Sequence, residues 1–479
     1  MRDAVTSMAG VHAATAARSR PPVYFLATYW GARFQDWLCR FAVASLLAPG
    51  NVPALRERAR CKFLICTTEE DWRALQEDPH FRRLRALIDV VFLRNEERGP
   101  NEHKYVRMSR GHAMLAQACF EDGALAFNVN PDSIYPDGCV AEVERLYDNG
   151  HRVVLCAAIR FDLEGVEAEL IEQGHLAADR PVVLSMREAA RLGLRHFHIE
   201  SKASEWEAPN FGALSEEHRR DHYLTCCFWR VPGTDGGIIV THNWAPLLVD
   251  YTILNHHDTS TLDGRAIDGV YIFENFREAR IGSDIHVVRD SDSIFLLGMT
   301  PRDEMVPPQQ GYWWKSNRIV GPWCKGYILN QTIFDPAVDE TRRHLYGATV
   351  AWHSAGRDAS WLPVERKADR ILQRFATRDL KIERIAGRPG AARSVAGLLA
   401  DPVGFVVTLV RALLAPLGIV PRLAPRLLGW RGTWWALEAI RRAPLYVRVV
   451  VLALRGDREA TRQIGKRART ILRAMGLGA

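Results

Sequence analysis

Short apolar runs alternate with amphipathic stretches over the first third of the chain. Each apolar run has the length of a buried strand, and the stretches between them repeat their apolar side chains at helical spacing. This alternation predicts an α/β fold, with a mainly parallel sheet and helices on both of its faces. The predicted strands are Val23–Ala27, Cys61–Cys66, Ile88–Leu93, Ala124–Val129 and Val153–Ala158, and the predicted helices are Phe34–Leu47, Glu69–Leu75, His112–Phe120 and Val140–Tyr147.

The pattern changes in the second half, where turn residues separate several short apolar runs. These runs predict an antiparallel extension that covers one edge or face of the sheet. The segment Thr300–Lys325 is rich in Pro, Gly and Trp, and it predicts a long loop. The predicted strands of the extension are Leu224–Val231, Gly237–His242, Val270–Phe273, Ile285–Val288 and Ile294–Met299.

Positive charge is concentrated in a C-terminal tail with helical periodicity, residues 391–479. From Arg393 onward the chain has 15 Lys and Arg against four Asp and Glu, whereas all 479 residues together carry only +7. The most apolar stretch, Pro402–Pro421, contains Arg411 and Pro416, which are unfavourable inside a bilayer. We therefore expect the tail to lie on an anionic membrane surface without spanning it. A helical domain packed on the rest of the chain is an alternative, as is a homo-oligomer interface, while the high apolar content argues against a nucleic-acid partner.

The N-terminal residues and the cysteines bear on the compartment. Residues 1–21 are mostly small or polar and have no continuous apolar core of a secretory signal, so we expect a flexible lead-in. The nine cysteines are scattered through apolar runs, which is typical of reduced core thiols rather than of disulfides or a zinc site. Together these features predict a cytoplasmic protein, held at the inner face of the membrane by its tail.

Two predicted strands run directly into acidic residues. The first is followed by Asn130, Asp132 and Asp137 in the segment ALAFNVNPDSIYPDG, and the second by Asp290 and Asp292. Ligands of a parallel sheet bind outside the carboxyl ends of its strands, and carboxylates placed there can hold Mg²⁺ or Mn²⁺. The alternatives are a strand-end turn at the first place, because Asn, Pro, Asp and Gly are common turn residues, and a solvated hairpin turn at the second.

A basic group and one histidine are further candidates for a site. Lys104, Arg107, Arg110 and His112 lie at the start of the predicted helix before the first acidic strand end, where backbone N–H groups and basic side chains can cradle a diphosphate. A solvated helix start is the alternative. His242 ends a predicted strand, and it is either a hydrogen-bonded turn residue or a ligand in the same cleft as the aspartates.

Three common enzyme motifs are missing from the chain. It contains no G-x-x-x-x-G-K-[ST] loop, no G-x-G-x-x-G after the first strand and no G-x-S-x-G elbow. Their absence argues against a P-loop NTPase, a dinucleotide-dependent oxidoreductase and an α/β-hydrolase, respectively.

The order of several segments resembles bacterial glycosyltransferases of the GT-A fold over about residues 22–300. The segments are YFLATYWGARF, SLLAPGNVPAL, FLICTT, HKYVRMSRGH, NPDSIYPDG and HRVVLCAAIR. The resemblance implies a glycosyltransferase domain over 22–390, with a nucleotide-sugar half at about 22–200 and an acceptor half at about 201–390. It also implies a nucleoside-diphosphate sugar as the donor and a divalent cation, Mn²⁺ or Mg²⁺, held by an acidic motif.

The resemblance assigns a metal role to one strand end. Asp132 matches the metal or ribose–diphosphate residue of the family, with Asp137 nearby. Asp290 and Asp292 are reserve ligands, because their Asp-x-Asp spacing lets two carboxylates face one cation. Asn130 stands where the family motif has its first aspartate. This departure leaves a single carboxylate in the motif.

The remaining roles concern the nucleotide and the reaction. Thr28 and Thr67 match positions that contact the base and the ribose, and Lys104, Arg107 and Arg110 are the expected diphosphate contacts. The expected catalytic residues of the acceptor half are His242 and Asp268, and the expected acceptor contacts in the long loop are Trp313 and Trp314.

The acceptor is expected to be a glycan, a lipid or a protein, and the predicted membrane placement agrees with a lipid. Two other functions stay open at this point. One is a nucleotidyltransferase or hydrolase on a related sheet. The other is a non-catalytic scaffold at the membrane whose transferase-like domain has lost its metal site, as Asn130 suggests.

Overall fold

The computed structural model describes residues 20–99, 102–177, 180–213, 226–308, 325, 329, 345 and 347–386, with side chains described up to residue 373. The predicted tail, residues 391–479, lies outside these residues, as do Trp313 and Trp314 and most of the predicted lead-in. Arg20, at the end of that lead-in, forms ion pairs with Glu144 and Asp148.

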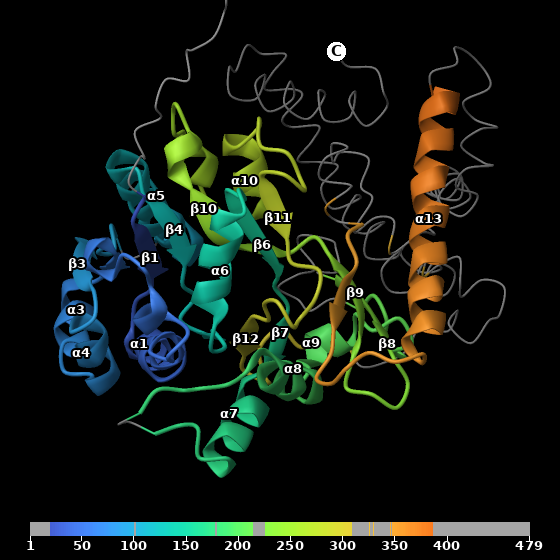
Figure 1. Cartoon of the computed structure of the whole chain (residues 1–479), viewed down its shortest axis with the longest axis horizontal. Helices are drawn as coiled ribbons and strands as arrows, with labels where there is room; N and C mark the ends of the chain where they lie inside the picture. The colour runs from blue at the N-terminus through green and yellow to red at the C-terminus, as the bar shows by residue number, and fades with distance from the viewer. Residues whose placement is uncertain are drawn as a thin grey trace, which may run out of the picture.

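A seven-stranded sheet lies at the centre, in the order β11-β6-β10-β4-β1-β2-β3 (Figure 1). All neighbouring strands are parallel except β10, which is antiparallel to both β4 and β6. The predicted α/β fold with a mainly parallel sheet is therefore confirmed. The bounds are β1 Val23–Thr28, β2 Lys62–Thr67, β3 Asp89–Arg94, β4 Leu125–Asn128, β6 Val153–Ala157, β10 Trp244–Asp250 and β11 Ile285–Val287.

The apolar runs form strands because the sheet is buried on both faces. In β1, Tyr24 and Leu26 belong to one hydrophobic core, whereas Val23, Phe25 and Ala27 belong to the other. Successive side chains of a strand point to opposite faces, so a strand between two cores must be apolar at every position. The five strands predicted in the first third of the chain are all present.

Helices cover both faces of the sheet (Figure 1). α5 contributes Leu115 and Cys119 to the first core, and α6 contributes Val140 and Val143 to the second. The helices are α1 Ala32–Trp37, α2 Ala44–Leu46, α3 Glu69–Leu75, α4 Pro79–Arg85, α5 Lys104–Asp122, α6 Cys139–Asp148, α7 Leu163–Glu172, α8 Met186–Arg195, α9 Ile199–Lys202, α10 Gly269–Asn275 and α13 Trp361–Ala386, with a π-helical turn at Leu38–Val43 between α1 and α2.

The strand order places a topological switch point at β1. From β1 the chain continues to β2 and β3 on one side, and it then returns to form β4 on the other side. The loops that leave the carboxyl ends of β1 and β4 therefore diverge and open a crevice between them, which is where ligands of such sheets bind.

Two small three-stranded sheets flank the central one, in the orders β5-β12-β7 and β13-β9-β8. The second is antiparallel and agrees with the predicted extension. Their strands are β5 Ser133–Ile134, β7 Arg160–Asp162, β8 Cys226–Arg230, β9 Gly237–Thr241, β12 Leu297–Thr300 and β13 Val350–Trp352.

Three predictions for the second half were wrong. The predicted strand Ile294–Met299 is present in part as β12, but β12 pairs in parallel with β7 in the other small sheet and does not belong to the antiparallel extension. Ile285–Val287 joins the central sheet as β11 instead of the extension, because it pairs in parallel with β6. Val270–Phe273 is not a strand but part of α10. The Asp268 carboxylate caps this helix by accepting hydrogen bonds from the backbone N–H groups of Val270 and Tyr271, and such a cap favours a helix over an extended run.

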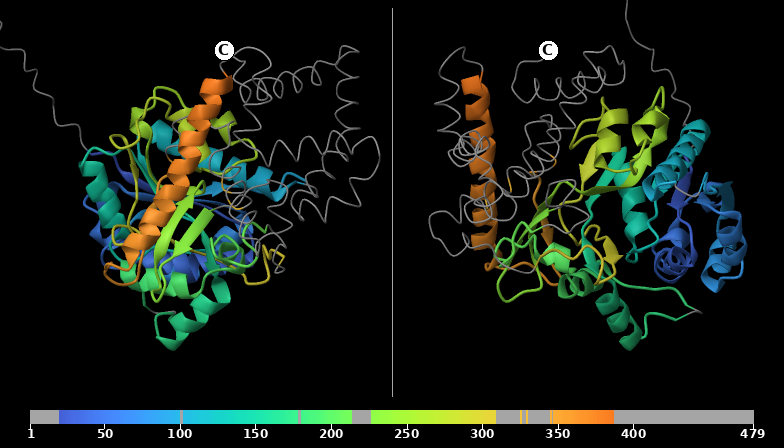
Figure 2. Two further views of the ribbon diagram at one scale, coloured as in Figure 1. Left: turned by 90° about the vertical axis from the view of Figure 1, so that its right-hand side faces the viewer. Right: turned by 180° about the vertical axis from the view of Figure 1, so that it is seen from behind.

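Helix α13 begins against β8 and β9 and extends well beyond these strands (Figures 1 and 2). It is the last described element before the predicted basic tail. Among the described residues, no helix has both the length and the apolar character that a membrane crossing requires.

Candidate functional site

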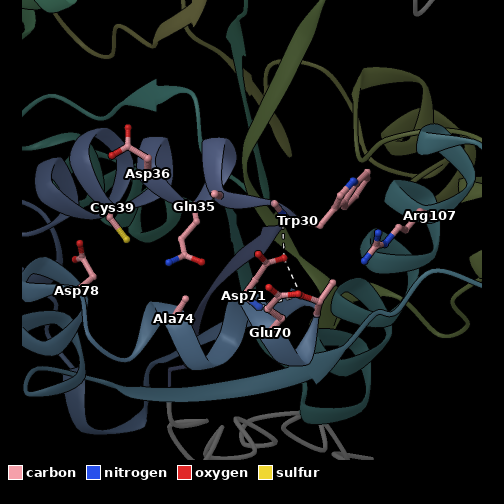
Figure 3. A pocket seen from close by; sticks show the side chains of 12 residues that line it. Trp30, Gln35, Asp36, Cys39, Glu70, Asp71, Ala74, Asp78 and Arg107 are labelled. Carbon is pink, nitrogen blue, oxygen red and sulfur yellow. Dashed lines mark hydrogen bonds between the residues drawn. The ribbon is translucent and has the colours of Figure 1, made fainter.

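A cavity of about 520 Å³ opens beside the carboxyl ends of β1 and β2 (Figure 3). Trp30 and Arg107 lie together at one end, and Cys39 and Asp78 lie at the other. We call this cavity the switch-point pocket because β1 borders it; it lies on the β2 side of that strand, and its lining includes no residue that follows β4. Its lining residues are Trp30, Gly31, Ala32, Gln35, Asp36, Cys39, Thr68, Glu70, Asp71, Ala74, Asp78 and Arg107.

The switch-point pocket is rich in hydrogen-bond acceptors. Four carboxylates line it, those of Asp36, Glu70, Asp71 and Asp78, against one guanidinium, that of Arg107. Carboxylates accept hydrogen bonds but do not donate them, so they suit a ligand that carries hydroxyl or N–H groups. The lining therefore favours a polar, hydrogen-bond-donating moiety over a purely anionic one.

Asp71 fixes the loop at the entrance of the pocket. Its Oδ2 accepts a hydrogen bond from the backbone N–H of Gly31, at 2.9 Å, and another from the hydroxyl of Thr68, at 2.7 Å. The Thr68 hydroxyl also accepts from the Asp71 backbone N–H and caps α3. These bonds join the end of β1 to the start of α3, so the pocket wall is preformed.

Thr28 and Thr67 lie at the strand ends that the sequence predicted. Neither lines the pocket, because Thr67 is fully buried and Thr28 packs under α5 against Gly111. Thr68, one position further along the chain, faces the cavity instead. The two predicted threonines lie behind the pocket lining, where the Thr67 hydroxyl donates to the Asp71 carboxylate at 3.4 Å.

The three predicted basic residues of α5 have different environments. Arg107 is buried, and its Nε and Nη2 donate to the backbone carbonyl of Asn95, while its guanidinium lies over the Trp30 ring at 4.7 Å from the ring centroid. Arg110 binds the side chain of Asn95 at 2.8 Å and also Glu102. Lys104 is exposed at the first position of the helix. Arg107 alone of the three reaches the pocket.

His112 does not belong to a basic cradle. Its Nδ1 accepts a hydrogen bond from the backbone N–H of Ile267 at 3.0 Å, which requires an unprotonated nitrogen. Burial lowers the pKa of His112 to about 4, so the ring is neutral at pH 7. The residue ties α5 to the segment before α10.

Asp132 is paired with an arginine that the sequence analysis did not single out. Its Oδ2 lies 2.8 Å from Nη1 of Arg160, and the two side chains are 19 and 39% exposed. Asp132 follows β4 and leads into β5, and Arg160 follows β6 and opens β7. The ion pair therefore joins the carboxyl ends of two strands of the central sheet.

A second arginine stands on the other side of the switch point. Arg33, in the first turn of α1, forms an ion pair with Glu304 at 2.9 Å. The carboxylates of Asp132, Glu200 and Glu304 all raise the pKa of Arg160, with Asp132 the strongest. Glu304 is therefore the ion-pair partner of Arg33, and Asp132 is the ion-pair partner of Arg160.

Asp137 has a structural role in a turn. Its Oδ1 accepts a hydrogen bond from the backbone N–H of Gly50 at 2.5 Å. The two segments are so close that a Cβ on Gly50 would lie 2.6 Å from the backbone nitrogen of Gly138. This contact explains the glycine, and it agrees with the turn alternative for Asp137.

Asp290, Asp292 and His353 form a group that can hold a metal ion, the Asp290 cluster. One ligand atom from each residue lies within 4.8 Å of the others, and within the described ranges this is the group that meets such a criterion. The cluster borders a separate cavity of about 620 Å³, which shares no lining residue with the switch-point pocket. Since β11 lies four strands away from β1, the two sites are on different parts of the sheet.

Each acidic member of the Asp290 cluster already has a cationic partner. Asp292 is held by Arg187 through two hydrogen bonds, at 2.9 and 2.8 Å, and this contact keeps the pKa of Asp292 low. Asp290 accepts from Nε2 of His353 at 2.8 Å and pairs with Arg357 at 3.1 Å. The hydrogen bond to Asp290 raises the pKa of His353. A metal ion would have to displace these partners.

The two predicted catalytic residues differ in their surroundings. His242 lies in the turn between β9 and β10. This turn is next to the carboxyl end of β6, where the Ala158 backbone N–H donates a hydrogen bond to the carbonyl of the neighbouring Asn243. Asp268 caps α10 with its Oδ1, and burial raises the pKa of its carboxyl group. The cap therefore engages one of the two carboxylate oxygens of Asp268.

Sequence reasoning missed Trp30, Asp71, Arg33 and Arg160. The pattern Thr-Thr-x-x-Asp before an amphipathic run is a capping signal that could have located Asp71. A single arginine after a strand carries no such signal, so Arg160 could be found only through its contact with Asp132. Comparison of the chain with protein families and with curated proteins gives no match.

Proposed function

We propose that this chain is a glycosyltransferase of the GT-A type, which moves a sugar from a nucleoside-diphosphate sugar to an acceptor hydroxyl. The observation that carries the proposal is the composition of the switch-point pocket. Its acceptor-rich lining suits a nucleoside, whose base and ribose carry N–H and hydroxyl donors, and Arg107 at its end suits a phosphate. The volume lies in the range of small-molecule sites.

The parts of the donor follow from this assignment. The nucleoside binds between α1 and α3, where Gln35, Asp71 and Thr68 offer polar atoms. The diphosphate extends past Arg107 toward the carboxyl ends of β4 and β6, where Arg160 stands. Thr28, Thr67 and Arg110 hold the surrounding loops, and Lys104 lies outside the pocket lining.

The resemblance implies a divalent cation at Asp132, and the residues there do not fit one. Asn130 supplies no carboxylate, the Oδ2 of Asp132 is taken by Arg160, and Asp137 accepts from Gly50. Mg²⁺ and Mn²⁺ favour sets of several oxygen ligands. The Asp290 cluster brings three possible ligands together and is therefore the better place for a cation, which would there have to displace Arg187 and Arg357. It lies outside the switch-point pocket.

We assign the catalytic base to His242 in preference to Asp268. The base must take a proton from the acceptor hydroxyl at the sugar end of the donor. His242 lies beside the carboxyl end of β6, close in the chain to the strand that contacts both β4 and β6. Asp268 is engaged in capping α10.

The acceptor and its location are proposed from the sequence. The basic tail, residues 391–479, would hold the enzyme at the cytoplasmic face of an anionic membrane, and the acceptor would then be a membrane glycolipid or a neighbouring glycan or protein. Trp313 and Trp314 are the proposed acceptor contacts.

The proposal is tested by incubating the full chain with UDP-, GDP-, CDP-, ADP- and dTDP-sugars and measuring the nucleoside diphosphate released. We expect slow release with one nucleotide class, and a loss of at least about tenfold in Arg107→Gln, since a hydrogen bond to a charged group contributes about 1.5–3 kcal/mol. Release of pyrophosphate from nucleoside triphosphates would favour a nucleotidyltransferase. No turnover and no binding of any nucleotide would refute both readings.

A further inference from the structure

The charge at the end of β4 is already balanced within the protein. Asp132 is the carboxylate that follows this strand, and Arg160 neutralises it at 2.8 Å. The ion pair is partly buried, so water screens it less than it screens a surface pair. A divalent cation at Asp132 would have to displace a guanidinium, with a single carboxylate left as its protein ligand.

The backbone of Arg160 is held firmly. Its carbonyl accepts hydrogen bonds from the Ser201 hydroxyl, at 2.7 Å, and from the His198 backbone N–H, at 3.3 Å. Residues 160–162 form β7, which pairs with β12. Because the main chain cannot shift easily, the guanidinium is directed toward the end of β4.

The Arg160 guanidinium has more N–H donors than its pair with Asp132 uses. The pair with Asp132 uses Nη1, and a guanidinium presents five N–H donors in a planar fork. This fork matches two phosphate oxygens, and arginine is weakly hydrated and always charged. With 39% of its side chain exposed, Arg160 can contact a ligand without breaking its pair with Asp132.

We propose that Arg160 takes the place of the divalent cation in this enzyme. This inference rests on the proposed function. In the transfer, the bond between the anomeric carbon and the β-phosphate oxygen breaks, and its electron pair leaves with the nucleoside diphosphate. The acceptor oxygen forms the new bond to that carbon, and its proton passes to the base. The Arg160 N–H groups bind the departing phosphate oxygens and stabilise their growing charge.

The test measures binding of UDP, GDP, CDP, ADP and dTDP to the full chain by calorimetry, first with EDTA and then with Mn²⁺. The variants are Arg160→Ala, Arg160→Lys and, as a matched control, Arg187→Ala. Arg187 also pairs with an aspartate at 2.8 Å but borders the other cavity. Circular dichroism verifies that each variant is folded.

We expect one nucleotide to bind equally well with EDTA and with Mn²⁺. Arg160→Ala should weaken its binding at least about tenfold, Arg160→Lys should weaken it less, and Arg187→Ala should leave it unchanged. Binding that requires Mn²⁺, or that is unchanged in a folded Arg160→Ala variant, would overturn the role of Arg160 and leave the proposed function standing. If no nucleotide binds under either condition, the proposed function fails, and this inference fails with it.

Discussion

Gly111 of α5 lies so close to Thr28 at the end of β1 that a Cβ built on the glycine would stand 2.3 Å from the threonine Oγ1. The contact brings the helix that carries Arg107 directly against the strand that opens the switch-point pocket. The position of Arg107 over Trp30 therefore depends on a residue without a side chain. Both residues lie in segments that the family resemblance selected, but the sequence did not show that they touch.

Gly111→Ala should destabilise the fold and weaken nucleotide binding. Alanine is favoured over glycine in a helix by about 1 kcal/mol, yet overpacking typically costs about 1–3 kcal/mol, so we expect a net loss of up to about 2 kcal/mol in the free energy of unfolding. Urea denaturation measures it. The double variant Thr28→Ala/Gly111→Ala should recover part of the loss, and a stabilised single variant would show that the two segments are not packed in this way.

The free energy of unfolding should fall in acid because of the buried His112. The unfolded chain protonates this histidine near pH 6.5, whereas burial lowers its pKa in the folded chain to about 4. Below pH 6.5 the unfolded state therefore binds more protons, and the free energy of unfolding falls as the pH falls, by at most about 1.4 kcal/mol per pH unit from this group.

His112→Asn is the matching variant, because its amide oxygen can still accept from the Ile267 backbone N–H and does not titrate. Urea denaturation between pH 7 and 4.5 should give a flatter pH dependence for the variant than for the wild type. Parallel curves would mean that His112 is not held neutral in the folded protein.

Any divalent cation held by the described residues should depend on the Asp290 cluster. Calorimetric titration with Mn²⁺ or Zn²⁺ compares Asp290→Asn with Asp132→Asn, two variants that each remove one negative charge from an arginine-paired aspartate. We expect Asp290→Asn to reduce cation binding and Asp132→Asn to leave it unchanged. The opposite result would indicate that the cation binds at Asp132, after the end of β4.

The basic tail should bind anionic vesicles. Each basic residue near an anionic lipid contributes about 1 kcal/mol, so the excess of positive charge from Arg393 onward is sufficient for reversible binding at low salt. Co-sedimentation with phosphatidylserine vesicles should capture the full chain, release it at high salt, and fail for a chain that ends at Arg393. Equal binding of both chains would rule out the tail as the membrane contact.

The strands of the first third of the chain were predictable because a parallel strand that is covered by helices on both faces is apolar at every position. β10 was not predicted, although it is central in the sheet. Its Pro246 cannot donate a ladder hydrogen bond, and the structure accommodates it beside a register shift between Pro246 and Leu248. A proline inside an apolar run normally indicates a loop or an edge strand, so the local pattern concealed this strand.

The site was predictable only at the level of strand ends. Asp132 follows a predicted strand, and Arg107 lies at the start of a predicted helix, so the sequence pointed to both residues. It could not show that Asp132 meets Arg160, since the contact depends on how β5 and β7 both pair with β12. It also could not show that Asp137 binds Gly50, which is 87 residues away along the chain.

If the proposed function is right, the switch-point pocket binds the nucleoside of a nucleoside-diphosphate sugar. Ala74 of α3 lines this pocket with a small side chain, whereas its neighbour Arg73 is exposed and outside it. Calorimetry with UDP, GDP, CDP, ADP and dTDP should be performed on the wild type, on Ala74→Trp and on the control Arg73→Trp. We expect one nucleotide to bind to the wild type and to Arg73→Trp with equal affinity, and at least about tenfold more weakly to Ala74→Trp, because an indole would fill the cavity. Equal affinity for all three chains, or no binding to the wild type, would show that the nucleoside does not bind in this pocket.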